Sequence, residues 1–383
     1  MTQPLLMIPG PVEVDGEVLA AMARPPMGHT GAGFIETFGK CLDDLRDVFA
    51  APDGQPLVVA GSGTLAMELA VANIVELGER AVVVDTGYFS ARMADILRRH
   101  GAEVESVGAE VGHVPELAAV EAALARGAKL LTVTHVDTST GVLAPVKELA
   151  ALARKYNTLI VVDGVCAVGG QEFRQAEWDV DVCLTASQKA LAAPPGLALV
   201  MARSRALEAF RARKSPVASY YSDWSLWLPV MQAYQARKPA YFGTPAVNLV
   251  VALNESVKQI KAEGMEARWA RHRKLSAAFK VGAEALGLRQ VPVSEDVRAV
   301  TLTTMYYPDG VDSTLIGRIG AAGVVVAGGL HPAVAARSFR VGHMGVDGIG
   351  QVLTTLAAIE QGLSGTLRAG AGVAAAQARW LQP

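Results

Sequence analysis

The 383-residue sequence predicts an α/β fold with a mainly parallel, doubly wound sheet. Between residues 57 and 204, apolar runs of strand length alternate with segments of helical periodicity. The runs are rich in Val, Ile and Leu and lack polar alternation, which is typical of strands covered on both faces. Alternation of such strands with helices is the pattern of a doubly wound sheet.

Six apolar runs are predicted to be strands of this sheet. They are residues 57–61, 81–85, 129–135, 158–164, 181–186 and 197–202. Helical periodicity predicts helices over 64–76, 90–101 and 146–157. The last of these has Lys and Arg in its final turns and Asn157 at its stop, as helix C-termini prefer.

The length of the chain predicts two domains rather than one. Residues 205–245 crowd aromatics and prolines, and a long helical pattern follows near 246–286. Further apolar runs at 299–308, 323–330 and 338–345 then alternate with helical patterns. We therefore expect an N-terminal arm (1–15), a large domain (16–260) and a smaller C-terminal α+β domain (261–383).

Composition excludes several classes of function. A net charge of −2 gives no basic surface for nucleic acid. No apolar stretch is long enough to cross a bilayer, and the N-terminus lacks the cationic region and cleavage site of a signal peptide. The widely spaced cysteines and histidines fit neither a disulfide framework nor a metal site. We expect a cytoplasmic protein with reduced cysteines, no metal and no membrane partner.

Polar residues follow three of the predicted strands, where open α/β sheets bind ligands. They are the GSGT turn at 61–64, Asp163, and Lys189 in SQKALAAPPG. Taken alone, the GSGT turn is explained as a helix cap, Asp163 as a turn cap and Lys189 as a surface lysine. The GSGT turn lacks the lysine of a P-loop and the third glycine of a dinucleotide site. Its backbone N–H groups can nevertheless bind a phosphate at a helix N-terminus.

The combination of these residues indicates pyridoxal 5′-phosphate. This cofactor carries a phosphate, a pyridine nitrogen that works best protonated, and an aldehyde that condenses with a lysine amine. Asp163 can pair with the protonated nitrogen. The amine of Lys189 becomes nucleophilic when a desolvated, cationic setting depresses its pKa.

The motifs GSG, THVDTSTGV, VVDGVCAVGG, SQKAL-x-APPG and YFGTP together resemble class V aminotransferases of fold type I. Within that family the likeness is greatest to the alanine–glyoxylate and the serine–pyruvate or serine–glyoxylate enzymes. It runs from IPGPVEV at the N-terminus to FRVG near residue 340. The resemblance implies a fold type I transferase that works as a homodimer with shared active sites. It also implies transfer of the amino group of alanine or serine to glyoxylate or pyruvate, by a ping-pong mechanism through a Lys189 Schiff base.

The resemblance also assigns roles to individual residues. Lys189 and Asp163 are the catalytic residues, and Asp163 pairs with the pyridine nitrogen. Arg340 and Gly10 bind the substrate, with Arg340 gripping its carboxylate. Tyr241 and Thr244 bind the cofactor phosphate from the other subunit. The remaining cofactor-binding positions are Ser62, Gly63, Thr64 and Gln188 for the phosphate, Phe89 and Val165 for the two ring faces, and Thr138 for the ring hydroxyl region.

The sequence departs from the family pattern at four positions. Phe242 and Gly243 stand where relatives often have histidines, Thr30 where many have arginine, and Thr64 where the animal enzymes have histidine. These replacements change side chains and leave the backbone N–H groups that bind phosphate in place, so we expect cofactor binding to persist. Substrate preference is the property that these departures affect.

Three other functions were weighed. A cysteine desulfurase needs a cysteine on a mobile C-terminal loop, and none follows Cys183. A 2-aminoethylphosphonate aminotransferase stays open, because it shares the cofactor plan. A non-catalytic cofactor-binding protein would be favoured by loss of Lys189, Asp163 or Arg340, and all three are present. The aromatic segment 220–242 fits a dimer interface or a plain core, and His135 fits a core histidine.

Overall fold

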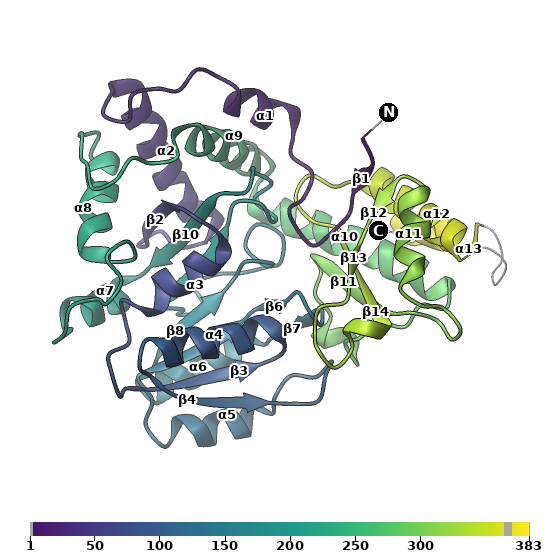
Figure 1. Ribbon diagram of the computed structural model, residues 1–383, viewed down its shortest axis with the longest axis horizontal. Coiled ribbons are helices and arrows are strands. Elements are labelled where there is room, and N and C mark those ends of the chain that lie inside the picture. Colours follow the sequence, from purple (N-terminus) through teal and green to yellow (C-terminus); the bar gives the residue numbers. More distant parts are fainter. Residues whose placement is uncertain (1–2, 364–369, 383) are drawn as a thin grey trace.

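A seven-stranded sheet forms the centre of the larger part of the molecule (Figure 1). The computed structural model describes residues 3–363 and 370–382. The order across the sheet is β2 (Gln55–Ala60), β10 (Leu197–Ala202), β9 (Val182–Ala186), β8 (Leu159–Asp163), β5 (Leu130–Thr134), β3 (Arg80–Asp85) and β4 (Glu103–Gly108). Only β10 runs against its neighbours, and the pairs from β9 to β4 are parallel. The predicted α/β class with a mainly parallel sheet is confirmed.

All six predicted strands are present, and sequence inspection missed β4. The six are buried along almost their whole length, as continuous apolar runs predict. The missed strand, EVESVG, mixes charged and apolar residues and is half exposed because it lies at the edge of the sheet.

Helices cover both faces of the sheet (Figure 1). Right-handed crossovers place α3 (Gly63–Val71) and α4 (Tyr88–Arg99) on one face, and α5 (Leu117–Leu124) and α6 (Val146–Lys155) on the other. The predicted helices at 64–76, 90–101 and 146–157 are confirmed, although α3 ends at Val71. The first part of the chain also contains α1 (Gly16–Met22), α2 (Ala32–Val48), α7 (Ser204–Arg211) and α8 (Trp224–Gln235).

The long helix predicted near 246–286 is two helices. α9 (Val247–Glu263) and α10 (Met265–Ala285) are separated by Gly264. This glycine has φ +80°, which L side chains rarely adopt, so the helical path is broken there.

A smaller three-stranded antiparallel sheet lies in the C-terminal part, in the order β11 (Leu302–Tyr306), β14 (Ser338–Gly342) and β13 (Ala327–Gly328). A two-stranded parallel pair joins β1 (Leu5–Leu6) to β12 (Val324–Val325). The accompanying helices are α11 (Thr314–Ala321), α12 (Ile349–Gly362) and α13 (Ala371–Trp380).

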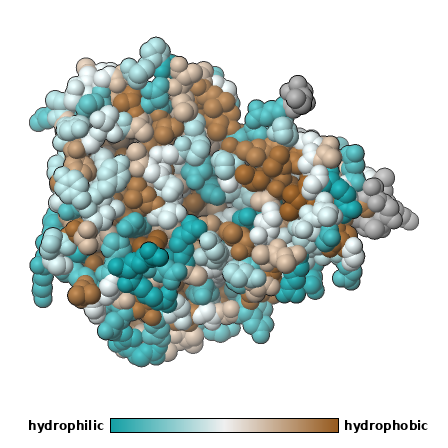
Figure 2. Space-filling view, in the orientation of Figure 1, coloured by the Kyte–Doolittle hydropathy of each residue, from teal (hydrophilic) through white to brown (hydrophobic). Residues whose placement is uncertain are grey.

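The protein has two large hydrophobic cores. One contains residues from 34 to 260, and the other contains residues from 275 to 376 together with Met7. Figure 2 shows hydrophilic residues over much of the larger part and a hydrophobic area near the N-terminal segment. No helix within residues 3–363 and 370–382 is long and apolar enough to span a membrane.

Candidate active site

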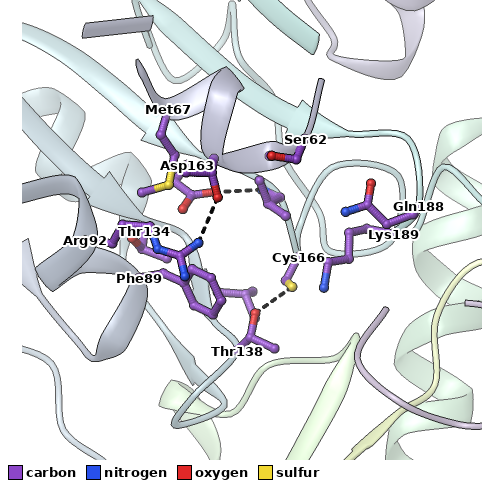
Figure 3. Close-up of a pocket in the computed structure, with 14 residues that line it drawn as sticks. Ser62, Met67, Phe89, Arg92, Thr134, Thr138, Asp163, Cys166, Gln188 and Lys189 are labelled. Atoms are coloured by element: carbon purple, nitrogen blue, oxygen red, sulfur yellow. Dashed lines mark hydrogen bonds between the residues drawn. The ribbon is translucent and has the colours of Figure 1, made fainter. Parts of the chain in front are cut away.

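A pocket of about 150 Å³ lies at the carboxyl ends of β5, β8 and β9 and at the N-termini of α3 and α4 (Figure 3). This is where a doubly wound sheet binds its ligands. The pocket brings together predicted residues from five separate segments of the chain. They are Ser62, Gly63, Thr64, Phe89, Thr138, Asp163, Val165, Gln188 and Lys189.

Lys189 follows β9 and lies on the side of the pocket opposite Asp163 (Figure 3). Its Nζ donates a hydrogen bond to the carbonyl oxygen of Pro9. Gly10, the residue after Pro9, has φ +98°, and a Cβ built on it would lie 2.7 Å from the lysine Nζ. Glycine therefore lets the N-terminal segment approach the lysine, which places Gly10 beside the site although it does not line the pocket.

Asp163 is the last residue of β8 and is only 3% exposed. Its Oδ1 accepts a hydrogen bond from the backbone N–H of Val165 at 3.0 Å. Within the described residues, Oδ2 has no hydrogen-bond donor, which leaves it available to a ligand. Burial raises the pKa of this carboxyl to about 6, and Asp137 adds to the rise while Lys189 and Arg92 oppose it.

The N-terminus of α3 forms an anion-binding cradle. Ser62 precedes the helix but its side chain makes no capping hydrogen bond, so the predicted alternative role as a cap is not seen. Among the described residues, the first backbone N–H groups of the helix have no partner, as anion binding requires. Gln188 lines the same pocket, and its buried Oε1 has no hydrogen-bond partner within that part of the chain. A Cβ on Gly63 would lie 3.2 Å from Val165, so this glycine allows the helix to approach closely.

The first turn of α4 positions Phe89 at the pocket. Asp137 accepts the N–H groups of Phe89 and Ser90 at 3.1 and 3.4 Å, and Ser139 Oγ accepts that of Tyr88 at 2.9 Å. The DTS segment thus anchors the helix that carries the aromatic ring. The sequence analysis assigned a role to Thr138 but none to Asp137 or Ser139, whose acceptors serve the backbone rather than a ligand.

Five further residues line the pocket that sequence inspection did not single out: Met67, Arg92, Thr134, Val136 and Cys166. Thr134, Val136 and Thr138 follow the two-residue period of an extended chain, which could have signalled a shared face. The Oγ1 of Thr138 lies 2.7 Å from the Sγ of Cys166.

Arg92 lies three residues after Phe89 on α4, a spacing that brings side chains together on a helix. Its guanidinium donates to Thr64 Oγ1 at 2.9 Å and lies 4.8 Å from the centre of the Phe89 ring. The cation therefore connects the anion cradle to the aromatic wall of the pocket.

Besides Gly10, three predicted residues lie outside the pocket lining. Arg340 is on β14, where its Nε donates to the carbonyl of Gly328 at 2.7 Å and burial lowers its pKa. Tyr241 is 66% exposed and contacts the ring of His29, and Thr244 is also exposed. Within a single chain these two residues do not reach the pocket, so their role across a dimer stays a prediction.

The pocket matches the three chemical groups of pyridoxal 5′-phosphate. Unpaired N–H groups at the start of α3 suit the phosphate, to which the amide NH₂ of Gln188 can also donate, and the free carboxylate oxygen of Asp163 suits a protonated ring nitrogen. The amine of Lys189 suits the aldehyde, and Phe89 and Val165 provide apolar surfaces for a flat ring.

Comparison with known proteins agrees with this geometry. The class V aminotransferase family model matches residues 17–377. The alanine–glyoxylate aminotransferase 1 of Saccharomyces cerevisiae is 39% identical over 356 residues, covering 89% of this chain and 92% of the yeast protein.

Two solved structures are also similar. Ureidoglycine–glyoxylate aminotransferase from Bacillus subtilis has a TM-score of 0.93 at 27% identity, covering 100% of this chain and 99% of that chain. Alanine–glyoxylate aminotransferase from Nostoc sp. has a TM-score of 0.90 at 33% identity, with coverages of 95% and 96%. The chain therefore belongs to the class V aminotransferases, which have the type I fold and work with pyridoxal 5′-phosphate.

Proposed function

We propose that the protein transfers the amino group of a small amino acid, alanine or serine, to glyoxylate or pyruvate. The observation that carries this proposal is the placement of Lys189 and a buried Asp163 on opposite sides of one small pocket with an anion cradle. All three similar proteins reported above are named for glyoxylate, and two of them for alanine. These names support glyoxylate as the acceptor and alanine as a donor.

When bound, pyridoxal 5′-phosphate supplies an aldehyde that condenses with amines and a ring that withdraws electrons from the substrate Cα. Asp163, through its unpaired Oδ2, would hold the proton on the ring nitrogen. Lys189 Nζ accepts the Cα proton as general base and then donates it as general acid. The N–H groups of Gly63 and Thr64 hold the phosphate, and Arg92 adds a positive charge beside them.

Arg340 is proposed to bind the substrate carboxylate. A guanidinium has five N–H donors, and the one on Nε donates to the carbonyl of Gly328. This bond fixes the plane of the group, and neither terminal nitrogen donates to any residue that the structure describes, so both can bind a carboxylate. The same residue can orient the amino acid and the 2-oxo acid, as a ping-pong exchange of the two requires.

The active form is proposed to be a homodimer located in the cytoplasm. Three tyrosines are exposed along one segment, with Tyr220 at 75%, Tyr221 at 41% and Tyr241 at 66%. Exposed aromatics of this kind are typical of protein interfaces. Tyr241 and Thr244 would then reach the phosphate of the partner's site. The domain boundaries at 15/16 and 260/261 remain part of the same proposal.

Single-turnover assays test the donor and the mechanism together. The holoenzyme mixed with L-alanine or L-serine, without an acceptor, should release about one pyruvate or hydroxypyruvate per active site. Glyoxylate added afterwards should yield one glycine per site. Absence of both keto acids, with release of phosphonoacetaldehyde from 2-aminoethylphosphonate instead, would move the enzyme to the phosphonate class. Absence of all three products would leave only cofactor binding.

Replacing Arg340 should mainly weaken substrate binding. For Arg340→Gln we expect KM for alanine to rise about 10- to 100-fold, because a hydrogen-bonded charge pair contributes about 1.5–3 kcal/mol. Arg337→Gln is the matched control, since Arg337 is nearby, exposed and packed over the ring of Tyr306. Steady-state kinetics with both variants checks this, and an unchanged KM in Arg340→Gln contradicts the assignment.

A further inference from the structure

A second pocket, of about 480 Å³, lies between α10, the segment 295–300 and α13. It shares no lining residue with the active-site pocket. Charged and hydroxyl side chains face it from all three elements. The polar residues that matter here are Arg273, Ser276, Lys280, Glu284, Arg298 and Arg379.

One face of α10 supplies most of this pocket. Arg273, Ser276, Lys280 and Glu284 are spaced by three or four residues, so they form a single row along the helix. The opposite wall comes from the 3₁₀ turn Glu295–Val297 and the residues after it. The helix therefore presents a hydroxyl, two cations and one carboxylate to the same pocket.

Lys280 is the central group of the row. Its Nζ donates to the carbonyl oxygen of Ala299 at 2.6 Å and makes no ion pair within the described residues. Burial and the neighbouring Arg298 lower the pKa of this lysine to about 8, while the carboxylates of Glu295 and Glu284 oppose the fall. Lys280 is half-buried, and removing a charge from water is costly unless it is paired. The ammonium group thus has carboxylates in its vicinity but forms no ion pair with them.

Two more polar atoms around the same pocket lack a hydrogen-bond partner in the part of the chain that the structure describes. The hydroxyl of Ser276 is buried, in a residue 1% exposed, and the Nε of Arg298 is buried as well. Buried polar groups in proteins are normally hydrogen-bonded, so each of these is an exception that calls for a ligand.

The charges around the pocket are only partly compensated. Arg298 pairs with Glu284 at 3.1 Å, and Arg273 pairs with Glu172 at 3.3 Å, outside the pocket. Arg379, like Lys280, has no ion pair among the residues that the structure describes. Two cations therefore remain without an ion pair, together with the carboxylate of Glu295, which also lines the pocket.

We propose that this pocket binds a small dianion whose charge lies on oxygen, either a phosphate or a dicarboxylate. The side-chain groups left unpaired at its inner wall donate hydrogen bonds, which selects an acceptor-rich ligand over a cation or an amine. An anion with several oxygens can contact both cations that form no ion pair, and it outweighs the single carboxylate of Glu295. The volume suits a small metabolite. This site does not depend on which amino acid the active site uses.

Isothermal titration of the holoenzyme with inorganic phosphate and with malonate tests the proposal. In low-chloride buffer we expect at least one of them to bind, and Lys280→Met to weaken that binding by about 10-fold or more. Lys258→Met is the matched control, because Lys258 lies on α9, is 65% exposed and should leave the affinity unchanged. Tighter binding of phosphate assigns the site to phosphate compounds, and tighter binding of malonate assigns it to dicarboxylates.

Several results overturn the proposal. The proposal is overturned if neither anion binds, or if the wild type and Lys280→Met bind with equal affinity. It is also overturned if titration with KCl at matched ionic strength gives the same signal as the two anions. Equal affinity would also be the result if malonate bound only at the active site. Ser276→Ala is the second variant should Lys280→Met fold poorly. It removes one hydroxyl from α10 and should weaken binding a few-fold, and an unchanged affinity counts equally against the site.

Discussion

Lys189→Ala should abolish transamination, lowering kcat by at least about 10³-fold while the protein still folds. General acid–base catalysis by a positioned side chain contributes about 10²–10⁴-fold, and the amine that holds the cofactor is lost as well. The only hydrogen bond of Nζ within the described residues goes to the carbonyl of Pro9. The fold should therefore tolerate the change, which circular dichroism and thermal unfolding will show alongside steady-state kinetics.

Two companion measurements separate the proton-transfer role from loss of charge. Lys189→Arg keeps a cation but cannot accept a proton near neutral pH, so it should be as inactive as the alanine variant. Added methylamine should restore part of the activity of Lys189→Ala, by replacing the missing base. In the wild type, borohydride reduction followed by peptide mapping should place the cofactor mass on the peptide containing Lys189. Substantial turnover by either variant without added amine would falsify the assignment.

Asp163→Asn should lower activity by about 10²-fold or more and yet stabilise the cofactor-free protein above pH 6. Activity falls because a neutral amide no longer keeps the ring nitrogen protonated. Stability rises because the buried carboxylate is costly without a partner, and its pKa is raised from 3.8 to about 6 by burial. Asn retains the acceptor for the N–H of Val165, so the turn after β8 is preserved.

The direction of the pH effect follows from this raised pKa. Below about pH 3.8 the carboxyl is protonated in both the folded and the unfolded chain. As the pH rises towards 6 the unfolded chain loses the proton first, so the folded state loses stability. The total loss is about 3 kcal/mol, at about 1.4 kcal/mol per pKa unit.

Urea unfolding of the two cofactor-free proteins at pH 4 and pH 8 checks this effect. The variant should be the more stable at pH 8, and the gap should shrink at pH 4. With the cofactor bound the order should reverse, because only the wild-type carboxylate pairs with the ring nitrogen. A variant that is less stable than the wild type at pH 8 without cofactor contradicts the effect of burial.

Buried strands and their carboxyl ends were predictable from the sequence because both depend on local patterns. A strand covered on two faces is a continuous apolar run, and the polar residue that ends it points to the ligand edge of the sheet. Asp163 and Lys189 were found in this way. β4 was missed because an edge strand is partly exposed and its residues mix charged and apolar types.

Other features of the site depend on tertiary contacts, which the sequence does not reveal. The bond from Arg92 to Thr64 joins two helices, and the contact of Thr138 with Cys166 joins two loops. The break between α9 and α10 rests on the backbone conformation of one residue, Gly264, in a pattern that otherwise reads as continuous helix.

The N-terminal segment links the two parts of the protein mechanically. Leu5 and Met7 are hydrogen-bonded to Gly323 and Val325 of the C-terminal part. Five residues beyond Met7, the N–H of Val12 is bonded to the carbonyl of Gln188, next to the catalytic lysine.

Because this segment is so short, it cannot lengthen much when its two attachment points move apart. A rigid-body rotation of the C-terminal part would pull the carbonyl of Pro9 away from the Lys189 amine, unless the pairing of β1 with β12 first came apart. Movement of β14, with Arg340, and release of the lysine from its resting partner would then be a single concerted displacement.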